Sequence, residues 1–237
     1  MYKKVLILVF SLQFVACAEL QKMAGEYALG QLTTPEIASA LRQALEFGIG
    51  NGSDLLSQKG GYLNSAYKIL LPPDVQKVTD KLKFIPGFTD VEKVLIEKLN
   101  NSAEDAAVKA KPIFRQAIKE MTFDDALKIL MGSDNAATSY LKSKTYNNLY
   151  TAFQPDIVSS LNKFNAIDYW NQAVNAYNRI PFVDKLNPKL DDYVTTQALN
   201  GLFSMVEKEE FGVRRDATKR VTDTMKKAFA KQDSNRQ

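Results

Sequence analysis

Hydrophobic residues recur at helical spacing along most of the chain beyond residue 33. Thr34-Pro35-Glu36 is typical of a helix start, since a hydroxyl caps free backbone N–H groups and proline suits the first turn. Ile37, Leu41 and Gly48 then fall on one helical face. The pattern predicts a first long helix in this region.

The middle of the chain repeats this pattern. Thr89-Asp90 begins a predicted helix whose apolar stripe reaches Ala107, and Pro112 is expected to kink or divide it because proline removes a backbone donor. Thr122 and Asp125 have the spacing of a capping box, and Gly132 is a typical helix end. A helix over residues 122–131 is therefore predicted.

The remaining apolar patterns also have helical spacing. They predict helices near residues 75–82, 134–141, 143–153, 155–163, 166–179, 190–211 and 216–231. No stretch alternates apolar and polar residues between turn dipeptides, as a strand would. We expect an all-α fold: a single multi-helix, bundle-like domain over residues 34–231, followed by a frayed polar tail, 232–237.

The N-terminal segment has the pattern of a signal peptide. Lys3 and Lys4 precede the apolar run 5–16, which is shorter than the roughly 20 residues of a spanning helix. The sequence Phe14-Val15-Ala16-Cys17 resembles a bacterial lipobox, whose cysteine receives a lipid. We predict a lipoprotein signal peptide, 1–16, lipidation of Cys17, and a tether and first helical segment, 17–33. An uncleaved anchor helix and a buried cysteine near an ordinary cleavage site are the alternatives.

Composition excludes several kinds of chemistry. The chain has no histidine and its one cysteine is assigned to lipidation, so histidine triads, thiolate sites and His-ligated zinc are excluded. A phosphate-binding Walker loop is also absent. Gly48-Ile49-Gly50-Asn51-Gly52 follows a helical pattern and not a strand, so close helix packing or a helix break explains it better than dinucleotide binding. We expect no cofactor and no resident metal.

Carboxylates are the remaining candidates for a polar site. The densest acidic groups near apolar stripes are Glu104, Glu120, Asp124 and Asp125, which could form a paired-carboxylate site or hold a cation through oxygen. The alternative for Asp124 and Asp125 is a structural role in the first turn of a helix, where negative charge favours the positive end of the dipole.

Charged residues gather near the C-terminus. Glu210 and Arg214 are four residues apart, a spacing that indicates an ion pair on a solvated helix face or, if buried, a structural clasp or polar ligand floor. Residues 211–237 hold eight basic residues against three aspartates, which suits either contact with anionic lipid or an ordinary exposed face.

Charge also bears on partners. Removal of residues 1–16 deletes Lys3 and Lys4 and lowers the net charge from +4 to +2, which argues against a nucleic-acid partner. Aromatic residues are concentrated between Tyr140 and Tyr177, where they could form core or line a groove. This region is not notably basic, so it does not have the character of a base-stacking groove.

Three long stretches resemble one bacterial family, the domain of unknown function 4197. They are "SAEDAAVKAKPIFRQAIKEMTFDDALKILMGSDNAATSYLKSKT" (102–145), "YNNLYTAFQPDI" (146–157) and "DDYVTTQALNGLFSMVEKEEFGVRRDATKR" (191–220). One departure is Asn100-Asn101-Ser102, where the family usually has an Asn-Arg pair before an Ala-Ala-Glu segment. The resemblance implies an exported helical protein and carries no established activity.

These observations leave three functional hypotheses. The first is a lipid-anchored binding or scaffold component of an envelope assembly, without enzyme activity, on the periplasmic side of the outer membrane. Its partners would be the membrane, through the N-terminal lipid, and envelope proteins. The second is a carrier that holds a lipid or another apolar small molecule between helices. The third is a carboxylate-dependent hydrolase.

Overall fold

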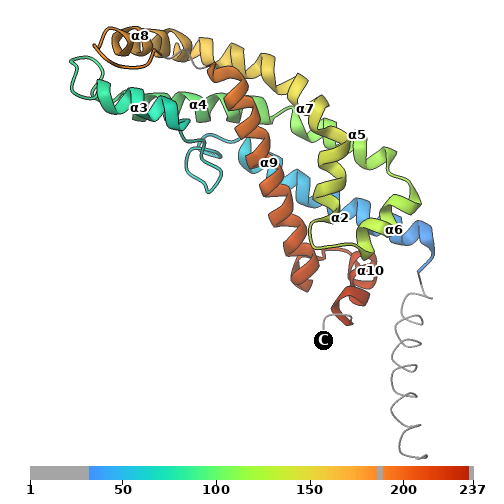
Figure 1. Cartoon of the computed structure of the whole chain (residues 1–237). Coiled ribbons are helices and arrows are strands. Elements are labelled where there is room, and N and C mark those ends of the chain that lie inside the picture. The colour runs from blue at the N-terminus through green and yellow to red at the C-terminus, as the bar shows by residue number, and fades with distance from the viewer. Residues whose placement is uncertain (1–31, 186–188, 235–237) are drawn as a thin grey trace, which may run out of the picture.

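The described part of the protein has an all-α fold, as predicted. The computed structural model describes residues 32–185 and 189–234, and within these ranges it contains nine α-helices, one 3₁₀ turn and no strand (Figure 1). The helices are α2 (Thr34–Leu56), α3 (Pro73–Leu82), α4 (Val91–Ala107), α5 (Ala110–Glu120), α6 (Phe123–Met131), α7 (Ala136–Lys163), α8 (Ala166–Asn178), α9 (Leu190–Arg215) and α10 (Asp223–Ser234), with a 3₁₀ turn at Ala217–Lys219.

Helix α2 begins with a capping box one residue earlier than expected. Thr33 is the N-cap, and its backbone N–H donates to Glu36 Oε2 at 2.7 Å. The helix then runs unbroken through its glycines, of which Gly48 and Gly52 face α9. A Cβ atom at Gly52 would lie 2.9 Å from Met205 Cγ. Close helix packing, and not a helix break, is therefore the reason for these glycines.

Helix α7 is one continuous helix where three were predicted. Its buried positions include Leu141, Thr145, Leu149, Phe153 and Ile157, each four residues from the last, so a single face contacts the core along the whole length. Pro155 lies inside this helix. Burial of the continuous face outweighs the local break signals, because tertiary packing provides most helix stability.

Of two other helix boundaries predicted from sequence, one is confirmed and one is wrong. The division near Pro112 is confirmed: α4 ends at Ala107, and Pro112 lies in the first turn of α5, where its missing N–H is not needed. The last helix, however, begins at Asp223 and not near residue 216. Val221 is therefore exposed, whereas Met225 and Phe229 are buried as predicted.

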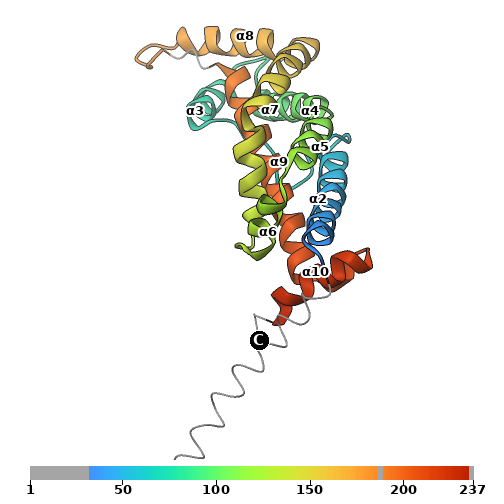
Figure 2. The same cartoon turned by 90° about the vertical axis from the view of Figure 1, so that its right-hand side faces the viewer.

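Helix α9 is central to the packing. It lies against α7 on one side and α2 on another, and α4 also packs on α7 (Figure 1, Figure 2). Helices α3 and α8 lie together at one end of the molecule, and α6, α10 and the start of α2 lie at the other. In the described ranges, no helix is both long and apolar enough to cross a membrane.

The aromatic residues of the middle region divide between core and surface. Phe153, Trp170 and Tyr177 are buried, whereas Tyr146 and Tyr150 are partly exposed. Phe203 of α9 packs edge-on against Phe114, with ring centroids 5.7 Å apart, and stacks on Tyr146. Most of these rings therefore contribute to the core.

Candidate functional site

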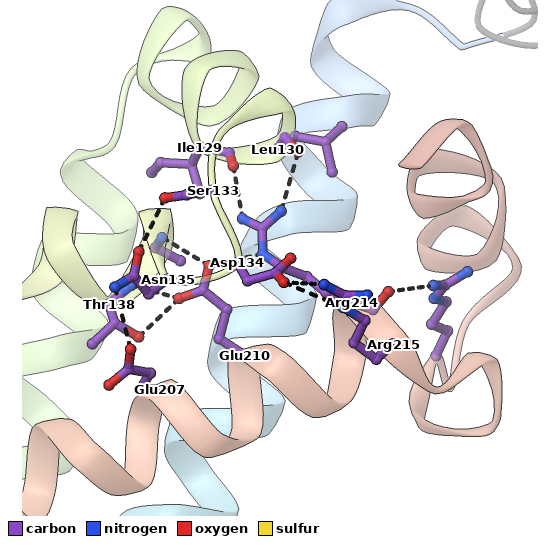
Figure 3. A network of polar contacts seen from close by, with 12 residues as sticks. Ile129, Leu130, Ser133, Asp134, Asn135, Thr138, Glu207, Glu210, Arg214 and Arg215 are labelled. Atoms are coloured by element: carbon purple, nitrogen blue, oxygen red, sulfur yellow. Dashed lines mark hydrogen bonds and ion pairs between the residues drawn. The ribbon is translucent and has the colours of Figure 1, made fainter. Parts of the chain in front are cut away.

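Glu210 of α9 caps the N-terminus of α7. The α7 N-cap residue, Asn135, makes no capping hydrogen bond, and the first backbone N–H groups of a helix need acceptors. The Glu210 carboxylate supplies them: Ala137 N donates at 2.9 Å and Thr138 N at 2.8 Å, and the Thr138 hydroxyl also donates (Figure 3). A carboxylate is favoured at this positive end of the helix dipole.

Arg214, one turn further along α9, binds the C-terminal end of α6, the helix before α7. It donates through Nε to Glu210 at 2.9 Å, and through Nη1 and Nη2 to the carbonyl oxygens of Leu130 and Ile129 in the last turn of α6 (Figure 3). Arg214 is 1% exposed and Glu210 is 8% exposed. The solvated face expected for this pair is therefore wrong, and the alternative of a buried clasp holds.

Arg220 extends the same arrangement to α10. It is buried, and it donates to the carbonyl oxygens of Val213 and Arg214 at 3.0 Å each, in the last turn of α9. Its guanidinium also makes a bidentate ion pair with Asp233 of α10. These bonds end α9 and orient the final helix, which explains why α10 starts later than predicted.

Glu104 of α4 holds a turn between α2 and α3. Its carboxylate accepts backbone N–H groups from Gly60, Tyr62 and Leu63 at 2.9–3.1 Å, and its side chain is buried. One turn earlier on α4, the buried Asn100 both accepts from Ile69 N and donates to Ile69 O, as a neighbouring strand would. Glu104 is therefore a structural residue that fixes the backbone of residues 60–63, and Asn100 fixes that of Ile69.

The structure brings Glu120 and Asp125 together on one groove. This groove, which we call the α5–α7 groove, has a volume of about 530 Å³ and is lined by polar residues of α5, α6 and α7, among them Gln116, Glu120, Asp125, Tyr140, Lys144 and Asn148. Glu104 and Glu210 bind backbone groups elsewhere in the fold. Asp124 is not among the lining residues of the groove, so Glu104, Glu120, Asp124 and Asp125 form no common site.

Asp125 has a local structural role as well. It completes the predicted capping box, because Thr122 N and Thr122 Oγ1 both donate to its Oδ2. Those hydrogen bonds, from the side chain and then the backbone, lower the pKa of Asp125. Burial, followed by the charge of Asp125, raises the pKa of Tyr140. The groove therefore presents a carboxylate and a neutral phenol near neutral pH, which suits binding a polar or cationic group.

The other predicted site residues are placed as follows. Asp124 is exposed in the first turn of α6, where it favours the helix dipole. Glu120 is exposed and accepts a hydrogen bond from Gln116. Cys17 lies outside the described residues. In the ranges that the structure describes, no group of three or more Asp, Glu, His or Cys residues could hold a metal ion.

An apolar cavity lies beside the Glu210–Arg214 pair, between α2, α9 and α10. Leu41, Leu45, Ile49 and Phe229 are among its lining residues. Its volume is about 20 Å³, which is room for about one water molecule. This cavity is too small for a lipid or another apolar ligand.

The sequence did not predict a structural role for Asn100 or Arg220. Asn100 and Glu104 are polar residues within the apolar stripe of α4, four residues apart, and that position could have indicated buried side chains with backbone partners. Arg220 lies among many basic residues, and its role depends on where α9 ends. The sequence offers no comparable signal for it.

Comparison with known proteins defines a family but no activity. Residues 31–230 match the family described as a protein of unknown function, DUF4197. The chain belongs to this family, in agreement with the resemblance noted above. No curated protein and no solved structure matches the chain.

Proposed function

We propose that this protein is a lipid-anchored component of the bacterial envelope, on the periplasmic side of the outer membrane, that acts by binding a partner protein. The anchor rests on the lipobox-like sequence that ends at Cys17. A binding role, as opposed to catalysis, is supported by the use of the buried ionic groups: Glu104, Glu210, Arg214 and Arg220 all hold backbone segments in place.

The observation that carries the proposal is an exposed apolar face on α6. Phe123, Leu127 and Met131 follow one another at intervals of four residues, and each is 41–48% exposed. Ala126, Ile129 and Leu130 on the other side of α6 are buried in the core. Helix α6 is therefore apolar on two sides, and only one of them packs against the core. Burial of the exposed apolar side by a partner protein would be favourable, which makes this face suitable for binding.

Site-specific photo-crosslinking tests this function. A photoreactive amino acid is placed at Leu127 in the full chain, in native membranes, and crosslinked proteins are identified by mass spectrometry. The matched control is Val108, which is also exposed but lies between α4 and α5. We expect one discrete partner from position 127 and none from 108. The same products from both positions would contradict a specific α6 interface.

The anchor has its own test. Incorporation of a fatty-acid analogue is compared between the wild type and Cys17→Ser. Labelling of the wild type alone is expected, because Cys17 provides the only thiol in the chain. Equal labelling of the two proteins would end the anchoring proposal without affecting the α6 interface.

A second candidate function is small-molecule binding in the α5–α7 groove, favoured by the convergence of Glu120, Asp125 and Tyr140 there. Carboxylate-dependent hydrolysis would use the same groove. To test the groove, equilibrium binding of cationic and polyol probes is measured for the wild type and for Glu120→Gln. This variant leaves the α6 face unchanged, so a loss of probe binding would identify the groove and not the protein-binding face. Equal binding to both proteins would exclude the groove.

A further inference from the structure

Two connecting loops lie at the end of the molecule formed by α3 and α8. Residues 83–90 join α3 to α4, and residues 179–185 and 189 are the described part of the connection between α8 and α9. Both views place them at the same end, away from α10 (Figure 1, Figure 2). Phe88 of the first loop contacts Tyr169 of α8, with ring centroids 6.3 Å apart, which ties that loop to the helix from which the second emerges. We call these two segments the loop end.

Each loop projects a phenylalanine into water. Phe84 is 81% exposed and Phe182 is 108% exposed, so the Phe182 ring is as accessible as in an extended peptide. Phe182 also has a φ of +63°, a left-handed conformation that is strained for a bulky residue. The fold thus presents an aromatic ring that it neither buries nor relaxes, a combination that is concentrated at functional positions.

Basic residues accompany these rings. The loop end contains Lys83, Arg179, Lys185 and Lys189 against Asp90 and Asp184. Lys83 Nζ lies 5.4 Å from the centroid of the Phe84 ring. Phenylalanine together with lysine and arginine occurs in segments that bind at the interface of a bilayer, where the apolar side chains enter the boundary between headgroups and acyl chains and the cations face anionic lipid.

We infer that the loop end is a membrane-contact surface that inserts Phe84 and Phe182 into the headgroup region of a bilayer containing anionic lipid. A bilayer can cover each projecting ring separately, whereas a protein would need two matched pockets. This inference deepens the proposed envelope attachment and rests on it. From Cys17 to Leu32 the chain can extend at most about 50 Å, comparable to the roughly 40 Å length of α7. The tether therefore lets the loop end face the anchoring membrane.

Single introduced cysteines test this contact in the full lipidated protein. Phe84→Cys and Phe182→Cys are each labelled with a polarity-sensitive fluorophore, and Phe47→Cys, at a half-exposed phenylalanine of α2, is the matched control. Vesicles of phosphatidylethanolamine with phosphatidylglycerol are compared with vesicles of phosphatidylcholine. We expect a blue shift and quenching by brominated lipid at positions 84 and 182 and not at 47. The effect should be larger with phosphatidylglycerol and should weaken as salt is raised.

The outcomes separate this inference from the anchor. If the protein floats with the vesicles but neither loop label shifts, membrane contact by the loop end is overturned and the anchor stands. A shift that needs an added envelope protein instead of lipid also overturns it. Labelling of the parent protein, which lacks an introduced cysteine, would reveal a free Cys17 and overturn the anchor. In that case the blue shift and the quenching by brominated lipid are measured for labels at positions 84 and 182 in a Cys17→Ser background.

Discussion

Two regions of the molecule are held by polar side chains one helical turn apart, in chemically different ways. On α4, Asn100 and Glu104 bind the backbone between residues 60 and 69. On α9, Glu210 and Arg214 bind the first turn of α7 and the last turn of α6, on either side of the connection between these helices (Figure 3). In both regions a long helix binds backbone groups of a segment that is distant in sequence: a turn in the first case and two helix ends in the second.

The difference lies in how the buried negative charge is balanced. Glu104 accepts three backbone N–H groups. Glu210 accepts two backbone N–H groups, the Thr138 hydroxyl and the Arg214 guanidinium. Dipoles stabilise the first carboxylate, and a full opposite charge contributes to the second. The α9 region therefore depends more strongly on keeping both members of its pair, because removal of one leaves a buried charge uncompensated.

The largest effect is expected from Arg214→Met. This change leaves Glu210 without its cation and removes two donors from the α6 carbonyl groups of Ile129 and Leu130. We expect the free energy of unfolding to fall by about 3–5 kcal/mol, as for other broken buried pairs. Urea denaturation followed by far-UV circular dichroism measures the change.

Arg215→Met is the matched control. Arg215 is the next residue of α9 and pairs with Asp134, but about half of its side chain is exposed. A pair of that kind contributes about 0–1 kcal/mol. Equal destabilisation by the two variants would mean that the loss of arginine packing, and not burial of the charge pair, determines stability in this region.

A smaller effect is expected from Glu104→Gln, which keeps the side-chain size but replaces a charged acceptor. One end of the amide would direct N–H groups at backbone donors of residues 60–63. We expect a loss of about 1.5–3 kcal/mol, the range for hydrogen bonds to charged groups. Hydrogen exchange of the Gly60, Tyr62 and Leu63 amides should accelerate.

Asp105→Asn controls for this second change. Asp105 adjoins Glu104 on α4 but is exposed, and its partners are the Ser160 hydroxyl and Lys163. Its substitution should leave exchange at residues 60–63 unchanged. If Glu104→Gln destabilises the protein as much as Arg214→Met does, the distinction between dipole and ion-pair balance is wrong.

The all-α fold class and several helix boundaries could be predicted from sequence, because they depend on local patterns. The capping box of Thr122 and Asp125 and the break before Pro112 are examples. The length of α7 could not be predicted in this way. It depends on packing against α4 and α9, which are distant in sequence.

The roles of the polar residues were harder to predict, because their partners are distant in sequence. Glu104 binds backbone more than forty residues away, and Glu210 binds residues more than seventy away. Sequence spacing related Glu210 to Arg214 but could not show that both are buried. It also made Glu104, Glu120 and Asp125 candidates for the same polar site, although only Glu120 and Asp125 line one groove.

The smallest effect concerns Tyr62, which belongs to the turn that Glu104 holds. Its hydroxyl donates to Ala198 O at 2.8 Å, so Tyr62→Phe should lower stability by about 1 kcal/mol at neutral pH. Burial, followed by the charge of Glu104, raises the pKa of Tyr62. The folded state therefore keeps the phenol neutral where the unfolded chain, with a pKa near 10, ionises.

The sign of the pH dependence follows from that difference. Above about pH 10 the unfolded state binds fewer protons than the folded state, so the contribution of Tyr62 is complete below that pH and is lost as the pH rises, by up to about 1.4 kcal/mol per unit. Urea denaturation between about pH 9 and 11 should show a steeper fall for the wild type than for Tyr62→Phe. Other tyrosines with raised pKa values, such as Tyr193, are present in both proteins, so their effects cancel. Parallel curves would mean that Tyr62 ionises in the folded protein and that the turn held by Glu104 opens to admit water, unlike the clasp on α9.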